Sequence, residues 1–176
     1  TMALRLLDII VTRRKEIDRK TTNVSGIFSY LQEIYDETKN PEDGRVKVDI
    51  CWEKGELYAE ENLLKTVLIN LTDNAITASE EGQTVEITGR RMENGYYFQV
   101  RDEGIGIPEE ELQKVTEAFY MVDKSRSRAH NGAGLGLALC TAILELHHSR
   151  LKIESTLGLG SCMSFLIPDE GAKVDE

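Results

Sequence analysis

The chain has 176 residues, which is enough for one domain with its own hydrophobic core. Its 31 acidic and 21 basic side chains give a formal net charge of −10, which argues against a general affinity for nucleic acid or anionic membranes. The longest apolar run, Leu135–Leu144, is too short to span a membrane, and the three cysteines lack metal-ligand spacing. Because Thr1 precedes Met2, we expect the chain to be a fragment of a longer protein.

Two helices are predicted at the start of the chain. The first covers Thr1–Arg19 and is short and highly charged, so it is either a terminal helix packed on its own domain or the stub of a longer helix. The second covers Asn23–Lys39, where apolar residues recur at helical spacing, and Asn40-Pro41 ends it.

The middle of the chain predicts two strands and a long helix. Alternation of apolar and polar residues indicates a half-buried strand over Arg45–Trp52, and Lys54-Gly55 then turns the chain into a short return strand over Glu56–Ala59. Glu60–Ser79 is predicted to be a helix. Its core face is formed by Leu64, Val67, Leu68, Leu71, Ala75 and Ala78.

The second half predicts two hairpins with a helix between them. Asn94-Gly95 is a strong turn signal between strands over Thr84–Met92 and Tyr96–Arg101. The remaining predicted elements follow in order: a glycine-broken loop Asp102–Pro108, a helical turn Pro108–Val115, a helix Leu135–His148, a hairpin of Leu151–Ser155 and Ser161–Ile167 about Gly158 and Gly160, and a loose acidic tail 169–176.

Every predicted strand alternates, and none is the continuous apolar run of a sheet covered on both faces. This predicts an α/β fold, a two-layer sandwich in which helices cover one face of a mixed, mostly antiparallel sheet. A P-loop fold is excluded because the GxxxxGK[ST] motif is absent from the sequence. A Rossmann fold is disfavoured because no glycine motif follows a strand within a βαβ unit.

Asn70 and Asn74 lie four residues apart on the long helix and therefore share a face beside its core stripe. Two amides at a core edge are compatible with a structural role. Their alternative use is to offer oxygens to a hard cation and N–H groups to phosphate.

Asp102 directly follows a predicted strand and precedes Gly104 and Gly106. Glycines at this spacing let backbone approach a ligand closely, and a carboxylate held there could accept a hydrogen bond from an exocyclic amine. A glycine-rich loop with an Asx turn is the alternative reading.

Gly132, Gly134 and Gly136 run directly into the apolar helix that follows them. The free N–H groups and dipole of a helix N-terminus favour phosphate. A local basic cluster in this acidic chain precedes them, formed by Lys124, Arg126 and Arg128. A solvated loop with incidental charge is the alternative. Gly158 and Gly160 by themselves indicate only a turn.

The order and spacing of these motifs resemble the N, G1, F, G2 and G3 boxes of the catalytic ATP-binding domain of sensor histidine kinases, within the Bergerat-fold superfamily. The motifs are Asn70-x-x-x-Asn74, Asp102-x-Gly104-x-Gly106, Phe119-Tyr120, Gly132-x-Gly134-Leu135-Gly136-Leu137 and Gly158-x-Gly160. The resemblance extends from about Arg45 to Pro168. It implies a catalytic domain over 21–168, preceded over 1–20 by the helical end of a dimerisation and phosphotransfer domain.

The resemblance also implies roles for individual residues. Asn74 would coordinate Mg²⁺, and Asn70 would contact the ion or the phosphates of ATP. Asp102 would accept from the adenine amine, while Gly104, Gly106 and Ile107 would shape the pocket. Phe119 would anchor a lid over 120–132. The groups expected to line or position the phosphates are Lys124, Arg126, Arg128, Gly132, Gly134, Leu135, Gly136 and Leu137.

Some positions depart from the family pattern. Many members carry a basic residue and an aromatic after the N box, where this chain has Thr77 and Ala78, and an arginine where it has Met121. Phosphate charge would then come from Lys124, Arg126 or Arg128, and no stacking partner for adenine is identified. ATP-hydrolysing members and anti-sigma-factor kinases place a glutamate at position 70. Asn70 cannot act as a base, which favours a histidine kinase.

The acceptor histidine expected of this family is not among His130, His147 and His148, the three histidines of the chain. His147 and His148 are predicted to complement the dipole at a helix C-terminus. We therefore expect this chain to be the ATP-binding domain of a kinase that phosphorylates a histidine on an adjoining domain. That histidine would then pass its phosphate to a response regulator. The family suggests a cytoplasmic domain of a membrane-anchored parent. The alternative is a nucleotide-binding module without transfer activity, either anti-sigma-like or a degenerate kinase.

Overall fold

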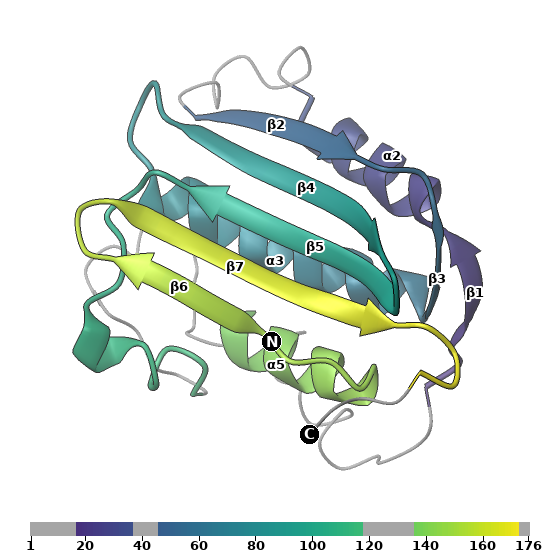
Figure 1. Cartoon of the computed structure of the whole chain (residues 1–176). Helices are drawn as coiled ribbons and strands as arrows, with labels where there is room; N and C mark the ends of the chain where they lie inside the picture. The colour runs from purple at the N-terminus through teal and green to yellow at the C-terminus, as the bar shows by residue number, and fades with distance from the viewer. Residues whose placement is uncertain (1–16, 37–45, 118–135, 173–176) are drawn as a thin grey trace, which may run out of the picture.

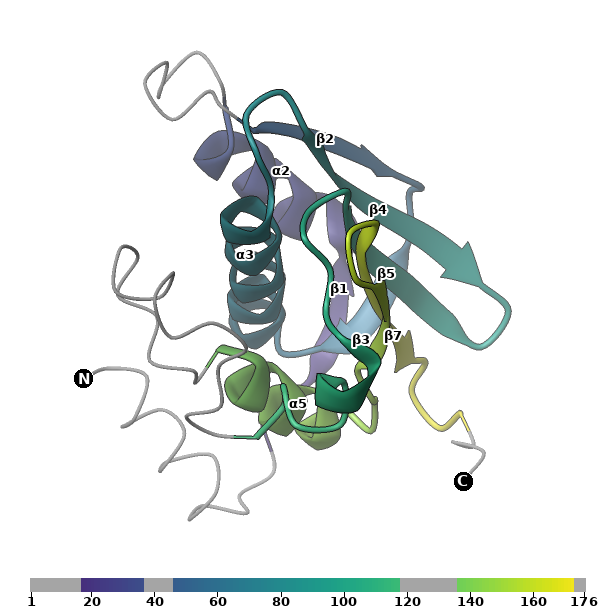
Figure 2. The ribbon, with the colours of Figure 1, turned by 90° about the vertical axis from the view of Figure 1, so that its left-hand side faces the viewer.

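A computed structural model of the chain describes residues 17–36, 46–117 and 136–172. A five-stranded sheet with strand order β2-β4-β5-β7-β6 has α2, α3 and α5 on one face (Figures 1 and 2). The elements are β1 (Lys20–Asn23), α2 (Val24–Ile34), β2 (Lys47–Trp52), β3 (Glu56–Ala59), α3 (Glu61–Ala78), β4 (Thr84–Met92), β5 (Gly95–Asp102), the 3₁₀ turn η1 (Glu109–Glu111), α5 (Gly136–Leu146), β6 (Lys152–Thr156) and β7 (Gly160–Pro168).

The sheet is mixed, as predicted. β2 runs parallel to β4, with Lys47 opposite Thr84, whereas the β4–β5, β5–β7 and β6–β7 pairs are antiparallel. The parallel pair arises because β3 and α3 lie between β2 and β4 in the chain and return it to the same end of the sheet. The two-layer α/β prediction is confirmed.

The core lies between the sheet and the helices. Inward-facing residues of the central strands, including Ile87, Phe98 and Phe165, are buried against α3, whose predicted core face is buried from Leu64 to Ala75. Ala78, which was also predicted for that face, is half-buried at the end of the helix. It contributes its backbone carbonyl to the neighbouring loop instead, as described below.

A row of aromatic rings crosses this core from α2 to β7. Phe28 of α2 stacks on Trp52 of β2, with ring centroids 5.0 Å apart and an interplanar angle of 7°. Phe28 also stacks on Phe98, and Phe98 on Phe165. Such ring pairs contribute about 0.5–1.5 kcal/mol each beyond the area that they bury. The row fixes α2 against the sheet.

The prediction that β3 turns back on β2 is wrong. β3 pairs antiparallel with β1, with Lys20 opposite Ala59, in a separate two-stranded sheet. The reason is that the chain before α2 is extended: the N–H of Val24 donates to the carbonyl of Gly55 over 3.0 Å, so β1 occupies the pairing edge of β3. Of the predicted helix Thr1–Arg19, residues 1–16 lie outside the described residues, and residues 17–19 are not helical, because the chain there leads into β1.

Two helices end earlier than their patterns predict. α2 ends at Ile34, because Tyr35 leaves helical geometry at φ −98° and ψ 23°. α5 ends at Leu146, and residue 148 is the reason: His148 has φ +56°, a left-handed conformation that stops the helix. The N–H of Ser149 then donates to the carbonyl of Leu144 over 2.8 Å, which closes a Schellman-type cap.

The prediction that His147 complements the helix dipole is wrong. His147 is 1% exposed, and its Nε2 atom accepts a hydrogen bond from the backbone N–H of Glu60 over 3.1 Å. Its Nδ1 atom lies 2.8 Å from the carbonyl of Ile143. Since Nε2 accepts and Nδ1 has only a carbonyl to bond, the ring is neutral with its proton on Nδ1. Burial accordingly lowers the pKa of His147 below its ordinary value.

The hairpins lie where their turn residues predict, and the helical turn after Pro108 is the short η1 followed by further turns. The predicted loose tail begins with a fixed residue: Asp169 accepts from Arg91 Nη1 over 2.8 Å, and its N–H donates to the carbonyl of Asn94 over 3.0 Å.

Among the described residues, no helix has the length and apolar character needed to cross a membrane.

Candidate nucleotide-binding site

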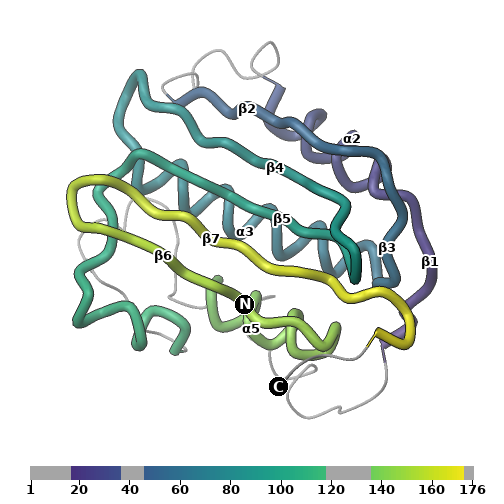
Figure 3. Tube along the Cα trace, in the orientation of Figure 1, coloured from purple at the N-terminus to yellow at the C-terminus, as the bar shows by residue number. Residues whose placement is uncertain are grey.

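The C-terminal end of β5, the β6–β7 turn and the C-terminal end of α3 meet at one end of the sheet (Figure 3). Asp102 is the last residue of β5 and is 6% exposed. Its Oδ1 atom accepts from the N–H of Gly104 over 2.9 Å, and the N–H of Ser161 also donates to this carboxylate. Burial raises the pKa of Asp102, and these two hydrogen bonds oppose the rise. A carboxylate has about four acceptor sites, so Asp102 keeps capacity for a ligand donor.

The glycines of this region are required by close approaches within the protein. A Cβ atom on Gly104 would lie 2.2 Å from the carbonyl oxygen of Ala78, and one on Gly106 would lie 2.1 Å from that of Thr156. Gly160 has φ +103°, and a Cβ atom there would lie 2.1 Å from the carbonyl oxygen of Asp102. We predicted that glycine would let backbone approach a ligand. In the structure these glycines let three backbone segments approach one another.

Hydrogen bonds fix the loop after Asp102 on both sides. The N–H of Ile105 donates to the carbonyl of Ala78 over 3.0 Å, and the carbonyl of Ile105 accepts from the N–H of Gly158 over 2.7 Å. The side chain of Gln83 donates to the carbonyl of Glu103 over 2.9 Å. The loop therefore joins α3 to the β6–β7 turn, and its shape is set before any ligand arrives.

Two serines complete this region, and the sequence reasoning missed both. Ser155 Oγ accepts from the N–H of Ile107 over 2.7 Å and donates to the carbonyl of Gly160 over 3.0 Å. It also lies 2.8 Å from Ser161 Oγ. Ser161 could have been found from strand register, since it pairs with Asp102 across β5 and β7. Ser155 has no such signal, because its role depends on the folded loop.

The amides of α3 lie beside the start of α5. Asn70 is half-buried and its Nδ2 group donates to the carbonyl of Thr66 over 2.8 Å, whereas Asn74 is exposed. A Cβ atom on Gly136 would lie 3.4 Å from Asn70 Oδ1 and 3.7 Å from Asn74 Nδ2. The structure therefore brings both amides close to the first residue of α5. Amide oxygens are ligands that a hard cation such as Mg²⁺ accepts.

The remaining predicted site residues fall into two groups. Ile107 and Leu137 are half-buried and pack against the core. The others lie outside the described residues, and so does the predicted lid over 120–132. They are Phe119, Lys124, Arg126, Arg128, Gly132, Gly134 and Leu135.

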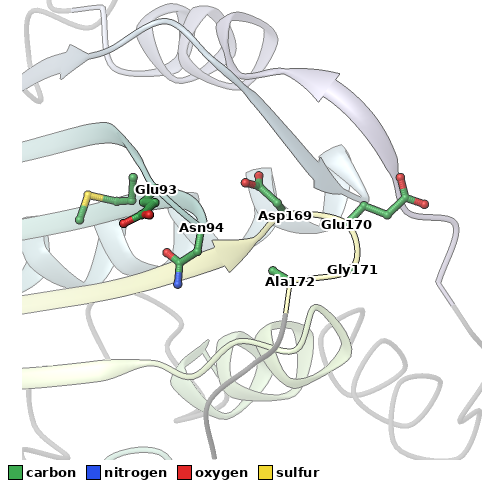
Figure 4. A pocket seen from close by; sticks show the side chains of 7 residues that line it. Glu93, Asn94, Asp169, Glu170, Gly171 and Ala172 are labelled. Carbon is green, nitrogen blue, oxygen red and sulfur yellow. The ribbon is translucent and has the colours of Figure 1, made fainter.

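A hollow of about 680 Å³ lies at the opposite end of the sheet, around the β4–β5 turn and the segment after β7 (Figure 4). Among the residues that the structure describes, its lining includes Glu93, Asp169 and Glu170 and no basic side chain, so the charge of this lining disfavours phosphate. The site at the end of β5 is the better candidate for a nucleotide, because it combines a buried acceptor with a fixed loop.

Residues 59–171 match the family model of histidine kinase-, DNA gyrase B- and HSP90-like ATPases. Over 112 residues, 64% of this chain, the sequence is 41% identical to the circadian input-output histidine kinase CikA of Synechococcus elongatus and, over an equal length, 41% identical to the phosphate regulon sensor protein PhoR of Haemophilus influenzae. These matches cover 15% and 26% of the two relatives, so the chain spans a minor part of their length.

Solved structures agree with the sequence comparisons. The catalytic domain of the histidine kinase ThkA superposes with a TM-score of 0.71 at 26% identity, over 87% of this chain and 97% of that domain. The family match and this shared fold lead to the same assignment: the chain belongs to the histidine kinase-, DNA gyrase B- and HSP90-like ATPase family.

Proposed function

We propose that this chain is the ATP-binding catalytic domain of a sensor histidine kinase, which transfers the γ-phosphate of ATP to a histidine on an adjoining dimerisation domain. The observation that carries the proposal is the buried Asp102 carboxylate, held by two backbone N–H groups at the junction of three glycine-dependent segments. The family and the histidine kinases among the relatives support it.

Asp102 would recognise the base of the nucleotide. The adenine amine is a donor and would pair with the free acceptor sites of the carboxylate, whereas the carbonyl of guanine would meet another acceptor. Gly104 and Gly106 would form the wall beside the base, with Ile107 contributing apolar surface. The expected preference is therefore ATP or ADP over GTP.

The other end of the site would hold the phosphates and Mg²⁺. The Nδ2 group of Asn70 is engaged by Thr66, so its Oδ1 atom remains available beside Gly136, and Asn74 offers a second amide. This donor set fits Mg²⁺, which when bound would neutralise phosphate charge. Phe119 would anchor the lid. Lys124, Arg126, Arg128, Gly132, Gly134, Leu135, Gly136 and Leu137 are proposed to position the phosphates.

In this proposal the group that accepts the γ-phosphate is a histidine of the dimerisation domain, which the described residues do not include. An imidazole nitrogen of the dimerisation domain would form a bond to the γ-phosphorus as the bond to the β,γ-bridging oxygen breaks and ADP leaves. Asn70 cannot take a proton as a glutamate would, so water is a poor alternative acceptor. His147 is excluded as the acceptor, because it is buried and both of its ring nitrogens lie within hydrogen-bonding distance of backbone groups.

The proposal includes a response regulator as the next phosphate acceptor and a membrane-anchored parent with this domain in the cytoplasm. Both rest on the family resemblance alone. A nucleotide-binding module without transfer activity remains the second candidate. The exposed and uncharged Thr77, at a position where many family members carry a basic residue, favours it.

The deciding experiment mixes this chain with a separately made dimerisation domain of the same parent protein and radiolabelled ATP. We expect label on the dimerisation domain that is acid-labile and base-stable, and none on this chain alone. ATP binding without any transferred label would support the second candidate. Acid-stable label on a serine would support an anti-sigma-type kinase.

A further inference from the structure

The side chain of Ser155 bonds both to the loop after Asp102 and to the first residues of β7. It lies near the end of β6, an edge strand of the sheet, and is half-buried. Its Oγ atom lies within hydrogen-bonding distance of the N–H of Ile107 at 2.7 Å, the carbonyl of Gly160 at 3.0 Å and Ser161 Oγ at 2.8 Å.

The direction of these bonds follows from proton counting. A serine hydroxyl has one proton and two acceptor sites. The carbonyl of Gly160 can only accept, so the proton of Ser155 goes to it. The N–H of Ile107 then donates to one acceptor site, and the hydroxyl of Ser161 donates to the other. All three positions of the Ser155 hydroxyl are used, and the orientation of the Ser161 hydroxyl is set.

Two of the three groups that bond to Ser155, those of Ile107 and Ser161, lie next to the proposed base-recognition residues. Ser161 donates its backbone N–H to the Asp102 carboxylate, and Ile107 is expected to pack against the base. The same segments also meet through backbone alone, since the N–H of Gly158 donates to the carbonyl of Ile105 over 2.7 Å. Without the Ser155 hydroxyl, the N–H of Ile107 and the hydroxyl of Ser161 would lose their partner while the chain path could persist.

We propose that Ser155 is a positioning residue for the nucleotide site, which fixes Ile107 and Ser161 so that the Asp102 carboxylate faces the adenine amine. The inference rests on the proposed function. It predicts an effect on the adenine end of the ligand, which ATP and ADP share, and none on the contacts to the γ-phosphate or Mg²⁺.

The test compares Ser155→Ala, Ser155→Thr and Ser149→Ala in the full chain, with ATP, ADP and GTP binding measured by calorimetry. Ser149 is the matched control, because its hydroxyl is buried without a hydrogen-bond partner among the described residues and lies before β6 rather than at its end. Urea unfolding of each variant identifies any loss of folded protein.

We expect Ser155→Ala to weaken ATP and ADP binding by the same factor, about 5- to 20-fold for the loss of a hydrogen-bonded hydroxyl. The ratio of ATP affinity to GTP affinity should also fall. Ser155→Thr keeps the hydroxyl and should return the affinity to within about twofold of the wild type. Ser149→Ala should bind as the wild type does. Amide exchange at Ile107 should be faster in Ser155→Ala and normal in Ser155→Thr.

Wild-type affinity and selectivity in a folded Ser155→Ala variant would overturn the inference, and so would a loss that Ser155→Thr does not restore. If Ser155→Ala does not fold, the test uses Ser155→Thr. Amide exchange at Ile107 as slow as in the wild type, together with a wild-type ratio of ATP affinity to GTP affinity, would support the inference, and faster exchange with wild-type affinities would overturn it. A wild-type chain that binds no nucleotide would refute the proposed function instead. In that case unchanged exchange at Ile107 in Ser155→Ala would separately refute the role of Ser155.

Discussion

The Nε2 atom of His147 accepts a hydrogen bond from the backbone N–H of Glu60, which links the end of α5 to the N-cap of α3. Protonation of Nε2 would place two donors against each other in a buried site, near Arg19, Glu60 and His148. Burial therefore holds the pKa of His147 in the folded chain below the unfolded value of about 6.5.

This shift predicts acid sensitivity of the fold. The folded chain binds fewer protons at His147 than the unfolded chain, so the contribution of the neutral ring is complete above pH of about 6.5 and is lost as the pH falls below it. The loss is at most about 1.4 kcal/mol per pH unit. His147→Gln keeps an acceptor for Glu60 but cannot titrate. Urea unfolding from pH 8 to 5 should show a shallower decline for the variant, and parallel curves would contradict the assignment.

His148 provides a second stability test. Its φ of +56° is costly for a residue with a Cβ atom, and glycine removes that cost while losing some unfolded-state entropy. We expect His148→Gly to raise the free energy of unfolding by about 0.5–1 kcal/mol. His148→Ala keeps the Cβ atom and should give no gain. An equal gain in both variants would show that the imidazole, rather than the backbone, is the source of the cost.

Gly160 and Gly158 form a matched pair in the β6–β7 turn. Both have positive φ, but a Cβ atom on Gly158 would meet nothing within 4 Å, whereas one on Gly160 would lie 2.1 Å from the carbonyl oxygen of Asp102. Gly158→Ala should cost about 1–2 kcal/mol of stability for the backbone alone. Gly160→Ala should cost clearly more and should also weaken ATP binding. Equal unfolding free energies for the two variants would argue against the close approach.

Asp102→Asn tests base recognition. The amide can donate where the carboxylate accepted, so we expect ATP binding to weaken by about 1–3 kcal/mol and the preference for ATP over GTP to narrow or reverse. Asp169→Asn makes the same chemical change at the opposite end of the sheet and should bind ATP as the wild type does. Calorimetry with both nucleotides measures the effect. Unchanged selectivity in Asp102→Asn would remove Asp102 from the base site.

Asn74→Ala tests the metal end of the site. Asn74 is exposed, so the fold should persist, and ATP binding should lose most of its dependence on Mg²⁺ if the amide contributes to holding the ion. Asn62→Ala changes an exposed asparagine in the first turn of the same helix and serves as the control. Titration of ATP with and without Mg²⁺ compares the variants. A full magnesium effect in Asn74→Ala would contradict this role.

Local patterns predicted the elements whose partners lie close in sequence. The hairpin about Asn94-Gly95 follows from its turn residues, and the core face of α3 from its helical spacing. The pairing of β3 could not be predicted in this way. Glu56–Ala59 has the same alternation whichever strand it meets, and the extended backbone before Val24 decides that it meets β1.

The residues of the candidate site likewise fall into those that sequence patterns reveal and those that only the folded chain reveals. Asp102 and the amides of Asn70 and Asn74 are visible in the sequence as spaced polar residues, and in the structure Asp102 accepts from Gly104 and the two amides lie near Gly136. Ser155 and Gln83 are not visible, because their partners are backbone groups of a loop whose course only the folded chain defines. His147 was misread for a related reason, since sequence locates it at a helix end but does not show that Glu60 lies against it.

The stack of Phe28 on Trp52 gives the protein a built-in optical probe. Trp52 is the only tryptophan in the sequence, and it lies on β2, at the edge of the sheet furthest in strand order from the β6–β7 turn. Its emission should therefore report whether α2 remains seated on the sheet, without direct quenching by a nucleotide at the end of β5. A rise in the midpoint temperature of its fluorescence transition on adding ATP would then report stabilisation of the whole folded domain by binding, rather than contact between the ligand and Trp52.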